Sequence, residues 1–455
     1  MDFLFKPSSV AVVGATPKVP KPGYVILSNM KRSYKGKLYA VNPKYKEVLG
    51  VPCYPSLREV PDEVELAVVA VPTSAVEAVV DDAIEKDVRA LIIITSGFSE
   101  VGNEELENRI KEKALSHGIR VVGPNCLGIY YYPSGLDTFF FREAGTPRPR
   151  PSGLALVSQS GALAASLMDW AASRGCGVGA AVSLGNKVDV GESEVLNYLF
   201  GEGFNHFLMY IEGLREGEGK AFLETVLKLR LGGARIGFYK GGRKRESAAA
   251  VASHTASVAG DYKAYRDLLF EFGATPLYDF AEVKAFVSAL QYSPELRGDK
   301  LLIVTDAGGI GIMLTDLIEG YKMPRPVDGE LERELPSYLR LNNPLDVGGD
   351  ADDERYRKAL ERLAPKYDLI IVAALMESPA TSLYLADIVK ESMERTGKPH
   401  LLLGFGGTMA EALERRAREL EIPFAFGVDE AVAYARVLLR DKFARELAEA
   451  RKSCC

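Results

Sequence analysis

Short apolar runs alternate with longer amphipathic stretches over the first part of the chain. Residues 10–13, 66–71 and 90–94 are apolar at consecutive positions, which is typical of strands buried on both faces of a parallel sheet. The stretches 74–86 and 104–117 have the apolar spacing of helices. Strands that alternate with helices predict an α/β fold with a doubly wound parallel sheet. Its strands are expected within residues 8–16, 38–43, 66–72, 90–97 and 120–125.

The same alternation returns twice further along the chain. In the second series, the strand expected within residues 154–161 is followed by a helix expected at about residues 162–172. In the third series, a helix over about residues 429–449 is expected to close the chain. Each series again reads as α/β, so the chain is predicted to hold three such domains in succession. The further strands are expected within residues 154–161, 180–186, 207–213, 236–239, 300–311, 368–375 and 400–405.

Proline marks the boundary between the first two series. Residues 142–151 contain three prolines and no apolar periodicity, which is typical of a connecting segment. We therefore predict a first domain over residues 1–130, a linker over 131–151, a second domain over 152–290 and a third over 297–455.

Composition narrows the class of protein. Over 455 residues, 47% are hydrophobic and 26% are charged, and the formal net charge of −6 gives no reason to expect nucleic acid or an anionic membrane as a partner. The five cysteines show no metal-ligand spacing, so no metal site and a reducing compartment are expected. With no signal peptide and no membrane-length apolar run, we expect a cytoplasmic protein.

Small and polar residues follow the strands of the first domain. Ligands of doubly wound sheets bind outside the carboxyl ends of the strands, so these residues predict a binding site. The dinucleotide fingerprint is absent, because the glycine after Gly14 is Gly23 and three prolines lie between them. Three lysines nearby, Lys18, Lys21 and Lys44, can neutralise phosphates, although each is equally compatible with a solvated surface charge. The candidate binding residues are Gly14, Ala15, Thr16, Lys18, Lys21, Asn42, Pro43, Lys44, Val71, Pro72, Ser96, Gly97, Phe98 and Asn125.

A second candidate site begins at the first strand of the second domain. Ser158, Gln159, Ser160 and Gly161 connect this strand to a predicted helix. Serine hydroxyls and free backbone N–H groups at a helix N-terminus can bind an anion. The alternative is that the serine only caps the helix.

The segment 240–260 contains His254 among small and hydroxyl-bearing residues. Small residues allow a large anionic partner to approach, so His254 is a candidate nucleophile on a mobile loop. Glu212 ends a neighbouring strand and is a candidate to hold the imidazole. The alternatives are a flexible surface loop with an incidental histidine, and a surface carboxylate.

Ten short motifs, in the same order along the chain, give it a resemblance to a known family. The chain resembles the alpha subunit of the NDP-forming acyl-CoA synthetases, the ADP-forming acetyl-CoA synthetase group, which are relatives of succinyl-CoA synthetase. The motifs are Gly14-Ala-Thr, Val41-Asn-Pro-Lys44, Thr95-Ser-Gly-Phe98, Gly123-Pro-Asn-Cys126, Ser158-Gln-Ser-Gly161, Leu184-Gly-Asn186, Tyr210-Ile-Glu-Gly213, Ser253-His-Thr255, Asp306-Ala-Gly-Gly309 and Asn343-Pro-Leu-Asp346.

The resemblance implies a fold and a reaction. It implies a Rossmann-like CoA-binding domain followed by two flavodoxin-like domains of the succinyl-CoA synthetase type. The reaction is reversible: acyl-CoA, phosphate and ADP give free acid, CoA and ATP, through an acyl phosphate and a phosphohistidine. The resemblance makes His254 the phosphorylated residue and Glu212 its partner. It also implies that residues 158–161 hold phosphate, and that Gly185 and Asn186 line the acyl pocket.

The resemblance also implies a partner chain. No segment of the sequence reads as the ATP-grasp module that the family needs, so a separate ATP-grasp beta subunit is expected, in an assembly of two alpha and two beta chains. ADP or ATP, with Mg, would bind on that subunit. One alternative is a succinyl-CoA synthetase-type ligase, whose alpha subunit typically has only the first two domains. The other is a non-catalytic CoA-binding scaffold, against which the presence of both Glu212 and His254 argues.

Overall fold

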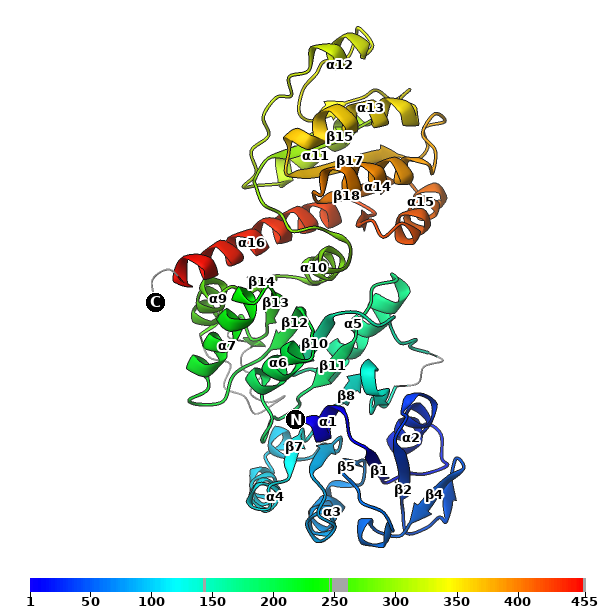
Figure 1. Ribbon diagram of the computed structural model, residues 1–455, viewed down its shortest axis with the longest axis vertical. Helices are drawn as coiled ribbons and strands as arrows, with labels where there is room; N and C mark the ends of the chain where they lie inside the picture. The colour runs from blue at the N-terminus through cyan, green and yellow to red at the C-terminus, as the bar shows by residue number, and fades with distance from the viewer. Residues whose placement is uncertain (142–144, 245, 248–260, 453–455) are drawn as a thin grey trace. The chain divides into compact units, whose positions relative to one another are not determined.

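The computed structural model describes residues 1–141, 145–244, 246–247 and 261–452 (Figure 1). Contacts divide the chain into two compact units, Met1–Phe272 and Gly273–Cys455. Within the described ranges, no helix is both long enough and apolar enough to span a bilayer. The candidate nucleophile His254 lies outside the described residues.

The first sheet of the first unit has the strand order of a Rossmann fold. Its strands run in the order β3-β4-β2-β1-β5-β6-β7, and all neighbours are parallel except the edge pair β3 and β4. In chain order the six parallel strands follow the 3-2-1-4-5-6 arrangement of dinucleotide-binding sheets. The strands are β1 (Ser9–Val13), β2 (Lys37–Val41), β3 (Glu47–Val48), β4 (Val51–Tyr54), β5 (Leu66–Val69), β6 (Ala90–Ile93) and β7 (Arg120–Val122).

Helices cover this sheet because its central strands β1, β5 and β6 are apolar at every position except Ser9. All residues of β1, β5 and β6 are buried. One face of the sheet packs against Val76 and Val80 of α3 and against Ile110 and Ala114 of α4. Removing this apolar surface from water is the main force that holds the layers together. The helices of this part are α1 (Asp2–Phe5), α2 (Pro22–Ser33), α3 (Thr73–Glu85) and α4 (Glu104–Ser116).

The second sheet of the first unit is flavodoxin-like, with an antiparallel ribbon at one side. Strands β13, β12, β10 and β11 are parallel neighbours in that order, and β8 and β9 continue the sheet antiparallel beyond β11. Its strands are β8 (Gly128–Tyr131), β9 (Leu136–Asp137), β10 (Leu154–Ser158), β11 (Ala180–Ser183), β12 (His206–Ile211) and β13 (Arg235–Lys240). Its helices are α5 (Gly161–Ser173), α6 (Glu192–Gly201), α7 (Gly219–Leu231) and α9 (Tyr262–Glu271).

The second unit is built on a parallel sheet with the strand order β16-β15-β17-β18-β19, the 2-1-3-4-5 order of flavodoxin. Helix α10 packs along α16, where Glu282 accepts a hydrogen bond of 2.9 Å from Arg440. The strands of this sheet are β15 (Leu301–Thr305), β16 (Leu345–Asp346), β17 (Leu369–Leu375), β18 (His400–Phe405) and β19 (Phe424–Ala425). The short strand β14 (Thr275–Pro276) also lies in this unit but is not part of the sheet. The helices are α10 (Phe280–Tyr292), α11 (Gly308–Leu317), α12 (Gly329–Glu334), α13 (Asp353–Leu363), α14 (Leu385–Thr396), α15 (Thr408–Glu419) and α16 (Val428–Lys452).

The predicted α/β class with parallel sheets is confirmed. The domain boundaries at residues 130, 151 and 290 stay a prediction, since contacts divide the chain only after Phe272. The predicted linker, residues 131–151, starts with ordered structure. Strand β8 ends at Tyr131 and β9 follows it, and both belong to the second sheet.

Candidate functional site

The loops at the carboxyl edge of the first sheet are joined by a close backbone approach and by hydrogen bonds from side chains to backbone carbonyl oxygens. Gly14 has a φ of +93°, and a Cβ on it would lie 2.3 Å from the carbonyl oxygen of Ala70. Only glycine fits there, so the loops after β1 and β5 touch directly. The Asn42 side chain donates to the carbonyl oxygen of Ala15 at 2.8 Å, and the Thr95 hydroxyl donates to that of Val71 at 2.7 Å.

The structure therefore brings the sequence-predicted residues of the first domain to one edge. Residues 14–16, 42–44, 71–72 and 96–98 all lie in the segments that follow β1, β2, β5 and β6. The side chains of Lys18, Lys21 and Lys44 are exposed, as a role in neutralising phosphates requires and as a solvated charge would also be. Asn125, with a φ of +57°, follows β7.

Asn125 contacts Gly185 and Asn186, the two residues predicted to line the acyl pocket. The Asn125 amide donates to the side-chain oxygen of Asn186 at 3.3 Å. A Cβ on Gly185 would lie 2.2 Å from the carbonyl oxygen of Pro124, so only glycine permits this approach. Asn186 also donates to Glu100 and Glu107, each at 2.7 Å. Burial would raise the pKa of Glu100, but hydrogen bonds from Asn186 and from the N–H groups of Gly97 and Phe98 hold it below its usual value.

A pocket of about 550 Å³ opens at the carboxyl ends of β10, β12 and β13. Ser160 lies at its rim as the N-cap of α5 and accepts from the N–H of Leu163 at 3.4 Å. The Ser158 hydroxyl is turned toward the backbone, donating to the carbonyl oxygen of Ser160 at 2.7 Å. Gly161 begins α5, whose first N–H groups and positive dipole end favour an anion. The lining residues are Ser160, Tyr210, Glu212, Tyr239, Lys240, Gly241, Gly242, Arg243, Lys244 and Ser247.

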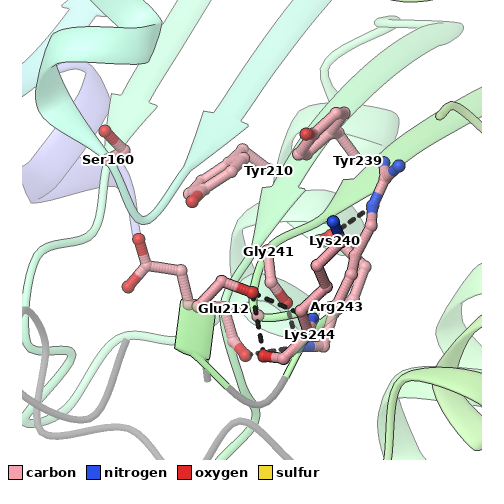
Figure 2. Close-up of a pocket in the computed structure, with 10 residues that line it drawn as sticks. Ser160, Tyr210, Glu212, Tyr239, Lys240, Gly241, Arg243 and Lys244 are labelled. Carbon is pink, nitrogen blue, oxygen red and sulfur yellow. Dashed lines mark hydrogen bonds between the residues drawn. The ribbon is translucent and has the colours of Figure 1, made fainter. Parts of the chain in front are cut away.

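Glu212 is a buried carboxylate on the pocket wall, with 3% of its surface exposed. Figure 2 shows Ser160, Tyr210 and the Glu212 carboxylate on one side of the pocket, and Tyr239, Lys240 and Arg243 on the other. Burial raises the pKa of Tyr210, and so do the charge of Glu212 and the hydrogen bond to it, which the hydroxyl donates. Glu212 therefore has a fixed neighbour on one side and faces the cavity.

Gln159 does not direct its side chain to the anion site. Its oxygen accepts from the N–H groups of Glu212 at 2.6 Å and Gly213 at 3.1 Å, and its amide nitrogen donates to Glu192 and to the carbonyl oxygen of Gly213. We therefore assign Gln159 to the support of Glu212, and leave Ser160, Gly161 and the helix N-terminus for the anion.

Sequence reasoning missed three charged residues that the structure places at or behind the pocket, namely Lys187, Glu192 and Lys240. Lys240 ends a strand that is otherwise buried, and its ammonium group donates to the carbonyl oxygens of Glu212 and Gly241, each at 2.6 Å. A charged residue directly after the apolar run 236–239 is the signal that could have found it. Lys187 and Glu192 gave no such signal, because their pairing depends on the fold.

Burial lowers the pKa of Lys240 from 10.5 to about 8, against the opposing effect of Glu212. Between pH 8 and 10.5 the unfolded chain holds this proton and the folded chain has released it, so the free energy of unfolding should rise with pH. Relative to Lys240→Met, wild-type stability should therefore gain up to about 3 kcal/mol between pH 7 and 10. Urea unfolding at both pH values measures this gain. The same substitution at exposed Lys220 is the control, and an equal gap at both pH values would contradict the prediction.

The described histidines have other surroundings. His400 is fully buried, with ring nitrogens 2.9 Å from the Ser392 hydroxyl and 2.9 Å from the carbonyl oxygen of Lys398. Burial lowers its pKa to about 4. His117 and His206 contact backbone carbonyl oxygens near them in sequence, and neither lines the pocket. In the sequence, His254 follows the pocket-lining residues 239–244 and Ser247, but it lies outside the described residues.

The arrangement can hold a phosphate-sized anion beside a buried carboxylate. Ser160 and the α5 N-terminus supply donors, and Lys240, Arg243 and Lys244 supply positive charge around the same cavity. Among the residues that the structure describes, no group of three or more His, Cys, Asp or Glu side chains is placed to bind a metal ion.

Sequence comparison identifies the family of the chain. Residues 8–132 match the family model of a CoA binding domain, and residues 151–290 match that of a succinyl-CoA ligase like flavodoxin domain. The chain is 35% identical over 440 residues to the alpha subunit of ADP-forming acetate–CoA ligase I of Pyrococcus furiosus, covering 93% of this chain and 94% of that protein. It is 34% identical to ADP-forming acetate–CoA ligase I of Archaeoglobus fulgidus, of which it spans 63%, and 37% identical to the Methanocaldococcus jannaschii enzyme, of which it spans 50%.

A comparison with solved structures leads to the same family. The fold superposes on dinucleotide-forming acetyl-coenzyme A synthetase 1 of Candidatus Korarchaeum cryptofilum, solved with phosphate and ADP, with a TM-score of 0.91 and 30% identity. The match covers 99% of this chain and 98% of that one. With its two matched domains, its sheet topology and its near-complete match to an alpha subunit, the chain belongs to the family of ADP-forming acetate–CoA ligases.

Proposed function

We propose that this chain is the alpha subunit of a cytoplasmic ADP-forming acyl-CoA synthetase. The observation that carries the proposal is the pocket at the second sheet, where the buried Glu212 carboxylate and the N-terminus of α5 face one cavity. The chain reaches His254 only a few residues after the last lining residue, Ser247. A carboxylate and an anion site in one cavity, with a nucleophile a few residues further along the sequence, are the parts that phosphoryl transfer through histidine needs.

The proposed reaction has three reversible steps. A phosphate oxygen attacks the thioester carbonyl of acyl-CoA, the C–S bond breaks, and acyl phosphate and CoA result. A ring nitrogen of His254 then attacks phosphorus, the P–O bond to the acyl group breaks, and the free carboxylate leaves. Finally, a terminal oxygen of ADP attacks the phosphohistidine and takes the phosphoryl group, which gives ATP and restores the imidazole.

Each part of the site has a role in this sequence. Ser160, Gly161 and the N–H groups at the start of α5 hold the phosphoryl oxygens where negative charge develops. Glu212 accepts the N–H of the other ring nitrogen of His254 and stabilises the imidazolium that forms. Asn125, Gly185 and Asn186, which lie together between the two sheets, line the acyl end.

We assign CoA to the carboxyl edge of the first sheet. The residues there are those predicted from the sequence, and the match to a CoA binding domain over residues 8–132 supports the assignment. The exposed lysines Lys18, Lys21 and Lys44 are the candidates for its phosphates.

We propose that the nucleotide binds on a separate ATP-grasp beta subunit, with Mg, in an assembly of two alpha and two beta chains. The name of the Pyrococcus furiosus relative, an alpha subunit matched over 94% of its length, supports a separate partner. The Archaeoglobus fulgidus relative, of which this chain spans 63%, is longer.

Reconstitution tests the proposal. The purified chain, mixed with acetyl-CoA, phosphate, ADP and Mg, should form no ATP above background, and adding the ATP-grasp partner should start ATP formation. The release of CoA and the formation of ATP should be stoichiometric. Net ATP synthesis by the chain alone would refute the separate partner. An inactive reconstituted complex that still binds CoA would instead favour a scaffold.

A further inference from the structure

A buried ion pair lies directly behind the pocket. Lys187 and Glu192 are each 2% exposed, and the Lys187 ammonium donates to Glu192 at 2.8 Å. Glu192 also accepts from the amide nitrogen of Gln159, while its second carboxylate oxygen has no partner among the described residues. Placing two charges in the interior costs desolvation that an apolar pair of the same size avoids. A gain in stability therefore does not explain why this ion pair is buried here.

The side-chain bonds that leave this group converge on the backbone of two residues, Glu212 and Gly213. The Lys187 ammonium and the Gln159 amide nitrogen both donate to the carbonyl oxygen of Gly213, at 2.7 Å each. The Gln159 oxygen accepts from the backbone N–H groups of Glu212 and Gly213. The backbone that carries the pocket carboxylate is thus held by side chains of two other elements, the β10–α5 turn and the segment after β11.

The other end of the group lies beside the candidate acyl site. Lys187 follows Asn186, whose amide donates to Glu100 and Glu107 in the first domain. Lys187 has a left-handed φ of +56°, a backbone conformation that costs free energy for a residue other than glycine. That conformation belongs to the tight turn Gly185–Lys187, in which the N–H of Lys187 donates to the carbonyl oxygen of Leu184 at 3.3 Å.

We propose that Lys187, Glu192 and Gln159 are positioning residues for phosphoryl transfer: they fix the backbone of Glu212 and Gly213, and so the Glu212 carboxylate, relative to the anion site at Ser160. The inference rests on the proposed function, since Glu212 must support a histidine for its position to affect turnover. None of the three residues touches the phosphoryl group through its side chain; they act through Glu212.

Two variants test the proposal in the complex with the beta subunit. Lys187→Met/Glu192→Leu removes both charges together and leaves no unpaired ion behind. Gln159→Met keeps the ion pair and removes the Gln159 bonds to Glu212, Gly213 and Glu192. The control is Asp137→Leu/Arg148→Met, which removes another buried ion pair of the first unit outside the pocket.

The measurements are kcat for ATP formation, KM for phosphate, the dissociation constant of CoA and the melting temperature. Both test variants should lower kcat about 10- to 100-fold, because a small misplacement of a catalytic group has effects of this size. The dissociation constant of CoA should stay within about twofold of the wild-type value. The melting temperature of each test variant should equal that of the control variant, although its kcat is lower. A purely structural role would instead move melting temperature and CoA binding together with kcat.

Three results would overturn the inference. One is wild-type turnover in folded Gln159→Met. Another is a kcat loss that the Asp137→Leu/Arg148→Met control shows equally. The third is failure of both test variants to fold, which would make the group structural. A wild-type complex that forms no ATP would refute the proposed function first, and the positioning role with it.

Discussion

Replacing His254 by alanine should reduce ATP formation from acetyl-CoA, phosphate and ADP to background, a loss of about 10⁴-fold or more in kcat. The reason is that the proposed route forms a covalent bond to the imidazole, and alanine offers no atom that can carry the phosphoryl group. Acyl phosphate formation does not use the imidazole, so CoA release should continue slowly in this variant. The binding of CoA should be unchanged.

The labelled intermediate provides the direct measurement. Radioactive phosphate with acetyl-CoA should leave an acid-labile label on the wild-type chain, and peptide mapping should assign it to the segment that contains His254. His117→Ala is the matched control, because His117 is exposed and its ring contacts the Ser116 hydroxyl and the carbonyl oxygen of Lys113 at its own helix end. Label on another histidine, or appreciable ATP formation by His254→Ala, would remove the covalent step from the proposal.

Much of the fold follows from local pattern alone. Strands such as β1, β5 and β6 are apolar at every position except Ser9 and are followed within a few residues by small or polar residues, so their type and their binding edge are evident from the sequence. Parallel strands place their carboxyl ends together. That geometry brought residues 14–16, 42–44, 71–72 and 96–98 to one edge, as predicted.

The ribbon of β8 and β9 was not predictable in this way. The ribbon joins the sheet through β8, which pairs with β11 about fifty residues further along, as in the pair Tyr131 and Ala180, while β9 pairs with β8. A short antiparallel ribbon with a proline in its turn has no distinctive period, and its pairing is a long-range property. Residues 131–151 were for that reason predicted to be only a linker.

The polar interior behind the site was hidden for the same reason. Charged residues are almost always on the surface, so Lys187 and Glu192 read as solvated charges in a loop and a helix start. Only the fold shows that they are buried and paired, with Gln159 beside them. Likewise, the sequence predicted that Gln159 holds phosphate, because nothing local shows that its amide is used by Glu212 and Gly213.

Glu212→Gln should lower kcat for ATP formation about 10²- to 10³-fold without unfolding the chain. Glutamine has nearly the same shape as glutamate, and the backbone of residue 212 is held independently by Gln159 and by the ammonium group of Lys240. The lost charge is what matters, since a neutral amide does not stabilise the imidazolium that forms when histidine takes the phosphoryl group. The phosphohistidine should therefore form more slowly and in a smaller amount.

The matched control for this charge change is Glu224→Gln, on an exposed face of α7 away from the pocket. It should leave turnover and melting temperature unchanged, as surface substitutions usually do. Rapid-quench labelling of the wild-type, Glu212→Gln and Glu224→Gln complexes with radioactive phosphate separates the transfer to histidine from the transfer to ADP. If Glu212→Gln is labelled at the wild-type rate, the carboxylate does not support the imidazole. Another group would then have to support the imidazole of His254. Lys187, Glu192 and Gln159 could not affect phosphoryl transfer by positioning Glu212.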